Sequence, residues 1–281
     1  MMLRYVLTAL ISVAGLFLSA SAYAQEPSGG GPFGGPPQRT ADLVLSARDD
    51  PRPLLTIAKQ LERHLGIPVT YEDPRRTAAD VVPTPPPGDD PTVRRTVPRR
   101  GTLEMTLRGG QGTRSVEAAK EALSDALTTR APTSGIRADF EVDRASAADM
   151  LHVRPITDST GGSPLDQRVT IPEGTTNLTQ LIDTVLRQVS SASGIEVAHA
   201  YGDVSALVAD VAVTNAVARD VLASAFASSR WADSAVIDRA PLLTWRLNFD
   251  FDLNVYLFNV ENVVVDVLTP TGAVVPTKAL R

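Results

Sequence analysis

The feature that most constrains this chain is an order of predicted elements that occurs twice. Residues 53–71 read as an amphipathic helix, the pair Gly66-Ile67 and a short alternating strand. Residues 177–199 follow the same order, with Gly194-Ile195 at the corresponding joint. A second helical pattern and two apolar runs follow in each half. Because internal repeats of this kind reflect a repeated structural unit, the sequence predicts a duplicated α/β arrangement.

The predicted fold class is α+β, with two similar lobes at residues 41–160 and 161–268. Each lobe is expected to carry two helices packed on a small mixed sheet, because an amphipathic helix must bury its apolar stripe. The predicted buried helix positions are Leu54, Ala58, Leu61 and Leu65; Val116, Ala119, Leu123, Ala126 and Leu127; Leu178, Leu181, Ile182, Val185 and Val189; and Val217, Val221, Leu222, Ala225 and Phe226.

The clearest strand signals lie in the second half. Residues 243–249 alternate strictly between apolar and other side chains, with a turn predicted at 250–254. Residues 255–265 then return as a long apolar strand, which could exchange strands with a partner if it lies at a sheet edge. In the first half, residues 140–142 and 150–153 are expected to form the two arms of a hairpin.

The N-terminus has the pattern of a secretory signal peptide. Arg4 precedes an uncharged apolar stretch, and Ala22-Tyr23-Ala24 supplies small residues at a cleavage site. We expect a signal peptide at 1–24, cleaved after Ala24, followed by a Gly/Pro-rich tether at 25–40. An uncleaved anchor is the alternative. Export without any cysteine is typical of a periplasmic or secreted protein that relies on an ordinary core.

Two segments are predicted to lack regular structure. The insertion at 74–101 contains prolines at positions 74, 83, 85, 86, 87, 91 and 98, and such a stretch is expected to form an exposed, partly polyproline loop that is dispensable for folding. The tail at 269–281 has little apolar pattern and is expected to fray.

No catalytic or metal-binding signature stands out. The three histidines, His64, His152 and His199, have no metal-ligand spacing and are expected to be structural. Asp250-Phe251-Asp252-Leu253-Asn254 matches the start of a calcium loop. However, Val255 stands where that loop needs glycine, so a tight turn is favoured. We therefore predict no catalytic residue, no metal site and no cofactor.

Three other groups have possible binding or catalytic roles. Asp139, Glu141 and Asp143 share one face of a predicted strand, where a solvated surface is favoured over acid and base catalysis. Arginines at 75, 76, 94, 95, 99 and 100 lie in the Pro-rich insertion and could bind an anionic glycan or lipid headgroup, although nearby aspartates favour a mixed-charge loop. Trp245 and Phe249 could stack on a sugar, but their alternation favours core packing.

The helix and glycine pattern resembles a known domain. Residues 61–71 and 186–197 look like the first helix and the Gly-hydrophobic strand of the secretin and TonB N-terminal (STN) domain. Residues 118–127 and 218–226 look like its second helix. The resemblance implies an interaction module without catalytic residues, placed in the periplasm.

The sequence thus predicts an exported, non-enzymatic protein that binds a protein partner in the cell envelope. The net charge of −5 argues against nucleic acid as the main partner, and no stable membrane span is expected after signal cleavage. Two alternatives stay open. One is a carboxylate-dependent hydrolase or glycan-processing enzyme, with Asp139 and Glu141 as candidates. The other is an anionic-glycan binder that uses the arginine-rich loop.

Overall fold

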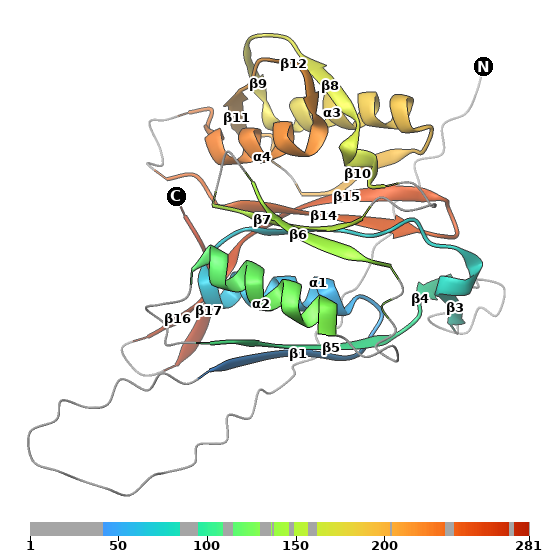
Figure 1. The fold of residues 1–281 in the computed structure, drawn as a ribbon. Coiled ribbons are helices and arrows are strands. Elements are labelled where there is room, and N and C mark those ends of the chain that lie inside the picture. The colour runs from blue at the N-terminus through green and yellow to red at the C-terminus, as the bar shows by residue number, and fades with distance from the viewer. Residues whose placement is uncertain are drawn as a thin grey trace, which may run out of the picture. The chain divides into compact units, whose positions relative to one another are not determined.

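A computed structural model of the chain describes residues 42–84, 95–108, 115–129, 136, 138–145, 149–156, 162–202, 204–233, 239–269 and 273–280. The predicted signal peptide and tether lie outside these ranges. Within them, we find no helix with both the length and the apolar character needed to cross a membrane. The chain is a mixed α+β protein whose strands form several sheets (Figure 1).

The helices of the described ranges are α1 (Pro53–Leu65), α2 (Val116–Thr129), α3 (Leu178–Ser193) and α4 (Ala218–Ser228), with short 3-10 helices η1 (Ala78–Asp80) and η3 (Pro164–Asp166). The strands are β1 (Leu43–Asp50), β2 (Val69–Glu72), β3 (Val81–Thr84), β4 (Arg95–Pro98), β5 (Gly101–Leu107), β6 (Phe140–Arg144), β7 (Leu151–Pro155), β8 (Arg168–Ile171), β9 (Thr175–Asn177), β10 (Val197–Tyr201), β11 (Leu207–Asp210), β12 (Val213–Val217), β13 (Arg230–Trp231), β14 (Leu243–Asp250), β15 (Val255–Asn262), β16 (Val264–Leu268) and β17 (Val274–Lys278).

The largest sheet has six strands in the order β10-β15-β14-β2-β7-β6. At one end, β2 lies parallel to β7, and β7 pairs with β6 as an antiparallel hairpin. At the other end, β10 lies parallel to β15, and β15 pairs with β14 as an antiparallel hairpin. The two triplets meet where β14 and β2 run parallel, and we call this junction the seam.

Helices cover both faces of this sheet. Figure 1 shows α1 and α2 on one face and α3 and α4 on the other. The first pair packs in a core with β1, β5 and the β2-β7-β6 triplet, and the second pair packs in a separate core with the β10-β15-β14 triplet. Each helix pair therefore lies between the large sheet and a smaller layer, which is β1-β5 for the first pair.

Most apolar positions predicted from periodicity are in these cores. Leu54, Ala58 and Leu61 of α1 and all five predicted positions of α3 are buried, and Leu65 is partly buried. The strand predicted at 243–249 is also confirmed as β14, and its apolar residues Leu243, Trp245, Leu247 and Phe249 are all buried. Thr244 and Arg246 between them are buried too, because helices cover both faces of this strand. α1 and α3 end in Gly66 and Gly194, whose φ angles of 68° and 69° are left-handed, as expected for helix C-caps.

The predicted loop at 74–101 is corrected by the structure. Its described residues contain η1 and an antiparallel hairpin in which β3 pairs with β4, from Val81 opposite Pro98 to Thr84 opposite Arg95. A two-stranded ladder tolerates proline because alternate backbone groups face away from the partner strand. The hairpin is anchored, since Asp252 accepts hydrogen bonds from Thr96 N and Oγ1, both at 2.8 Å.

Two further expectations for the C-terminal region are corrected. The strand predicted at 255–265 ends at Asn262 and is not at an edge, because β15 is flanked by β10 and β14. The tail predicted to fray at 269–281 contains β17, which pairs with β16 along its whole length. Sequence periodicity identifies a strand but does not give its neighbours. The interior position of β15 and the pairing of β17 with β16 could therefore not be predicted from the sequence pattern.

The seam is held by buried ion pairs on both faces of the sheet. On the α1 face, Glu62 pairs with Arg246 of β14, and their side chains are only 6% and 1% exposed. On the α4 face, Arg219 donates to both carboxylate oxygens of Glu72 in β2, at 2.6 and 2.8 Å. A helix of each pair therefore contacts a strand of the other triplet, so the two triplets are joined through side chains as well as backbone.

Removing one partner of a seam pair is expected to destabilise the fold strongly. Arg219→Met leaves the Glu72 carboxylate buried and unpaired, so we expect a loss of about 3–5 kcal/mol in the free energy of unfolding. The double variant Glu72→Gln/Arg219→Met should recover most of that loss. Urea denaturation measures both values.

As a control, Arg48→Met removes an exposed ion pair with Glu104 and should change the free energy of unfolding by no more than about 1 kcal/mol. Equal losses in the single and double variants would contradict this view of the seam.

Candidate functional site

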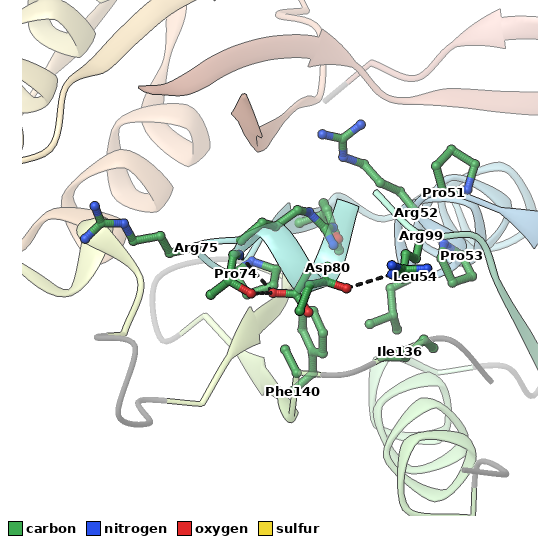
Figure 2. A pocket seen from close by; sticks show the side chains of 15 residues that line it. Pro51, Arg52, Pro53, Leu54, Pro74, Arg75, Asp80, Arg99, Ile136 and Phe140 are labelled. Carbon is green, nitrogen blue, oxygen red and sulfur yellow. Dashed lines mark hydrogen bonds between the residues drawn. The ribbon is translucent and has the colours of Figure 1, made fainter. Parts of the chain in front are cut away.

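A pocket of about 340 Å³ opens where β2 ends and α1 begins, and we call it the arginine pocket (Figure 2). Its walls come from residues 51–54 before and within the first turn of α1, residues 74–77 after β2, part of η1, and the start of β6. The lining includes four arginines, Arg52, Arg75, Arg76 and Arg99. Segments far apart in the sequence thus contribute arginines to one lining, and Figure 2 shows the Arg52 and Arg75 side chains extending away from the apolar side formed by Ile136 and Phe140.

The local sequence explains why the arginines gather there. Pro74 has no backbone N–H to donate, so the chain leaves the sheet directly after Asp73 and carries Arg75 and Arg76 out with it. Pro51 and Pro53 similarly shape the turn from β1 into α1, where Arg52 is the N-cap residue. Two proline-directed turns therefore form the rim of the pocket.

Asp73 organises the base of the pocket. Its fully buried carboxylate accepts hydrogen bonds from Arg52 Nε at 2.7 Å, Arg76 Nη2 at 2.8 Å and Tyr71 Oη at 2.6 Å. Burial alone would raise the pKa of Asp73, but the charges of Arg52 and Arg76 and the Tyr71 hydrogen bond outweigh burial and lower it. Asp73 is therefore ionised at neutral pH and holds two guanidinium groups in fixed positions.

The pocket is positively charged. Against the four lining arginines stand Asp80 in the lining and Asp73 behind it. Arg99 donates from Nε to the carbonyl of Ala79 at 2.7 Å, which orients its side chain without neutralising it. Within the described residues, Nε of Arg76 is buried without a hydrogen-bond partner. These guanidinium groups favour an anionic ligand.

The remaining wall of the pocket is apolar. Leu54, Ile136 and Phe140 face it together with three prolines, and Figure 2 shows Ile136 and Phe140 on the side opposite Arg52. Phe140 stacks against Tyr71 with their ring centroids 6.3 Å apart, which fixes this part of the wall. The pocket thus combines fixed cations with a surface suited to an apolar group.

A second hollow, which we call the edge groove, adjoins the arginine pocket. It has a volume of about 730 Å³ and lies along β6, between this strand and the C-terminal half of α2. Ile136 and Phe140 line both hollows. Among the described strands β6 has one neighbour, β7, so it forms an end of the six-stranded sheet.

The structure brings only some of the predicted arginines together. Arg75, Arg76 and Arg99 line the pocket, whereas Arg100 pairs with Asp49 at 2.8 Å and Arg94 lies outside the described residues. The pattern-based prediction missed Arg52, Tyr71 and Asp73. Arg52 precedes α1 and therefore lies outside the Pro-rich insertion in which the other arginines were found. The one local signal for this site is an acidic residue, Asp73, directly before Pro74.

The predicted acidic strand face is neutralised in part by an arginine. Glu141 and Asp143 both pair with Arg154 of β7, at 2.5 and 3.1 Å. Arg154 also lies 3.5 Å from Asp166, which pairs in turn with Arg219 of the seam. These carboxylates therefore belong to an ion-pair network at the partly exposed margin of the sheet.

The histidines have neighbours that account for their positions. His152 is buried, with Nδ1 at 2.7 Å from Thr70 Oγ1 and its ring centroid 5.3 Å from that of Trp245. His199 lies 3.2 Å from Asp183, and His64 is in the last turn of α1. In the part of the chain that the structure describes, no group of three or more histidine or acidic side chains is placed to hold a metal.

The predicted calcium-like turn and the predicted sugar-stacking aromatics also have contacts that give them structural roles. Asp250 accepts a hydrogen bond from Leu253 N at 3.0 Å in the predicted turn. Trp245 is fully buried and meets Phe226 edge to face at 5.4 Å, which confirms core packing. Phe249 is likewise buried and packs against Tyr256 at 4.9 Å.

No protein-family model, curated protein or solved structure matches this chain. The resemblance to STN domains therefore stays a prediction. The case for a functional site rests on the geometry of the arginine pocket and the edge groove.

His152 is expected to make stability depend on pH. Burial and the charge of Arg219 lower the pKa of His152 to about 3, so it is neutral in the folded state. In the unfolded chain its pKa is about 6.5. Stability from this group is thus fully present above about pH 6.5 and is lost as the pH falls towards 3, by about 1.4 kcal/mol per pH unit. Urea denaturation from pH 7 to 4.5 measures the slope.

Matched variants identify the group responsible for that slope. His152→Gln should flatten the dependence of unfolding free energy on pH in this window. His64→Gln, at an exposed helix end, should keep it. An unchanged slope in the His152 variant would show that other groups titrate there.

Proposed function

We propose that the chain is an exported, non-enzymatic binding protein whose arginine pocket receives an anionic group of a protein partner in the cell envelope. The observation that carries this proposal is the buried Asp73, which fixes Arg52 and Arg76 at the base of an accessible pocket. Preorganised guanidinium groups lose less conformational entropy on binding than free ones. They therefore favour recognition of carboxylate or phosphate oxygens.

The apolar wall distinguishes among anionic ligands. Leu54, Ile136 and Phe140 offer no hydrogen-bond partner from their side chains to sugar hydroxyl groups, but they bury apolar surface well. An anion attached to an apolar body therefore fits better than a sugar acid. This favours a protein segment with an acidic group and an apolar neighbour over the alternative of an anionic glycan.

A hydrolase is less well supported by the geometry. Of its predicted candidates, Glu141 pairs with Arg154, and the backbone carbonyl of Asp139 accepts a hydrogen bond from Ile156 N at 2.9 Å. The Glu141 carboxylate is therefore engaged in the ion-pair network around Arg154 rather than placed opposite a second carboxylate across a cleft. The proposed placement in the periplasm or outside the cell rests on the signal-peptide pattern and the lack of cysteine.

We also propose that the two lobes arose from one repeated unit. Gln60 of α1 exchanges hydrogen bonds with the backbone N–H and carbonyl of Ser46, and Gln188 of α3 does the same with Thr170. Both triplets of the large sheet also have the same strand order and directions. These correspondences support the predicted duplication.

The proposed binding chemistry is testable with small probes. We expect 4-phenylbutyrate, a carboxylate with an apolar body, to shift the backbone amide signals of Leu54, Thr77 and Phe140 in nuclear magnetic resonance titrations. Glucuronate at matched concentration should shift them much less. Arg76→Gln should weaken phenylbutyrate binding about tenfold or more, because a charge-assisted hydrogen bond contributes about 1.5–3 kcal/mol.

Two further variants control for indirect effects. Arg75→Gln alters an exposed pocket arginine that makes a weak hydrogen bond to Asn254 Oδ1 at 3.4 Å, so it should reduce affinity without unfolding the protein. Arg230→Gln, which removes a surface pair with Asp210 in the second lobe, should leave binding unchanged. Stronger binding of glucuronate than of phenylbutyrate would favour the glycan alternative, and binding of neither would overturn the proposal.

A further inference from the structure

The arginine pocket and the edge groove form a continuous track along one end of the central sheet. They share Ile136 and Phe140, and β6 runs away from the pocket along the groove. We propose that this track binds the C-terminal segment of a partner polypeptide as an added strand antiparallel to β6, with its terminal carboxylate in the arginine pocket. The inference rests on the proposed function and specifies the ligand of the same site.

The position of β6 supports strand addition. It ends the six-stranded sheet among the described strands, so one side of its backbone is not used by a neighbouring strand. The edge groove runs beside it over residues 139–143 and is bounded on the far side by Ser124, Leu127 and Thr128 of α2. A groove between a sheet edge and a helix accommodates an extended peptide, which gains backbone hydrogen bonds from the strand.

The charge of the pocket fixes the direction of the added strand. Phe140, the first residue of β6, lies at the pocket, and Arg144 lies at the other end of the strand. An antiparallel strand therefore brings its C-terminal end to the pocket, where the positive charges of the lining arginines attract a carboxylate. A parallel strand would bring its N-terminal end there, and a terminal ammonium group would be repelled.

The walls of the track indicate which side chains the segment carries. Leu54, Ile136 and Phe140 surround the end at the arginines, so the last residue should be apolar. Along the groove, Leu127 and Val142 are buried on the helix side, which favours further apolar residues at alternate positions. The pocket volume of about 340 Å³ is at the lower end of the range for small-ligand pockets, as expected for one terminal side chain with its carboxylate.

The test compares peptides that differ only at the C-terminus. The probe is N-acetyl-Thr-Val-Thr-Val-Thr-Leu, made with a free carboxylate and as the C-terminal amide. We expect the free acid to bind at least tenfold more tightly by isothermal titration calorimetry, because the amide lacks the charge that the arginines meet. A third peptide, amidated and ending in glutamate, carries the carboxylate on a side chain. Equal binding of the acid and either amide would overturn the inference.

Backbone methylation of the peptide tests strand addition without altering the protein. In an added strand, alternate N–H groups face β6, so N-methylation at successive positions should alternate between abolishing binding and leaving it nearly unchanged. The free acid should also shift the amide signals of Val142 and Arg144, whose N–H groups face away from β7, as well as those of the pocket. Equal effects of methylation at every position would contradict a strand and leave only a pocket contact.

Protein variants separate this inference from the proposed function. Phe140→Ala should weaken both phenylbutyrate and the peptide, whereas Thr128→Arg, which fills the groove away from the pocket, should weaken only the peptide. The Arg230→Gln control should bind both normally. Binding of phenylbutyrate with no preference for the free-acid peptide would overturn the C-terminal inference alone, and binding of neither would remove the proposed function as well.

Discussion

Two buried ion pairs brace the junction of β14 and β2, each by joining a helix that packs on one triplet to the seam strand of the other. The parallel backbone pairing at this seam is short, with Arg246 opposite Tyr71 and Leu247 opposite Glu72. The Glu62–Arg246 and Glu72–Arg219 pairs extend it on opposite faces. Because a buried charge is tolerated only with its partner in place, these pairs select one register out of several that backbone bonding alone would allow.

The seam also determines the geometry of the arginine pocket. Asp73 donates its backbone N–H to Leu247 O at 2.7 Å, and its carboxylate accepts from Phe249 N at 3.1 Å. The same carboxylate holds Arg52 and Arg76. One residue at the end of β2 therefore connects β14 to Arg52 and Arg76 at the base of the pocket, so the positions of these arginines depend on a strand from the other half of the chain.

The sequence pattern predicted what depends on local periodicity and missed what depends on distant partners. The buried positions of α3 and the alternation of β14 follow from side-chain spacing alone. The interior position of β15 depends on β10, and the role of Asp73 depends on Phe249, neither of which leaves a local signal. The hairpin in the Pro-rich segment was missed for a different reason, because proline frequency does not show which backbone groups face a partner.

The distance along the chain between the seam strands bears on how this protein avoids aggregation while it folds. Arg246 of β14 donates a hydrogen bond to the carbonyl of Val69 in β2, 177 positions earlier, so one edge of β2 stays unpaired until β14 has been added to the sheet. An open edge invites pairing with other chains, and inward-facing charges are a known protection against it. Glu72 and Asp73 lie at the end of β2, where desolvation without Arg219 and Arg52 is unfavourable. The carboxylates that stabilise the seam in the folded protein therefore also disfavour pairing of β2 with strands of other chains during folding.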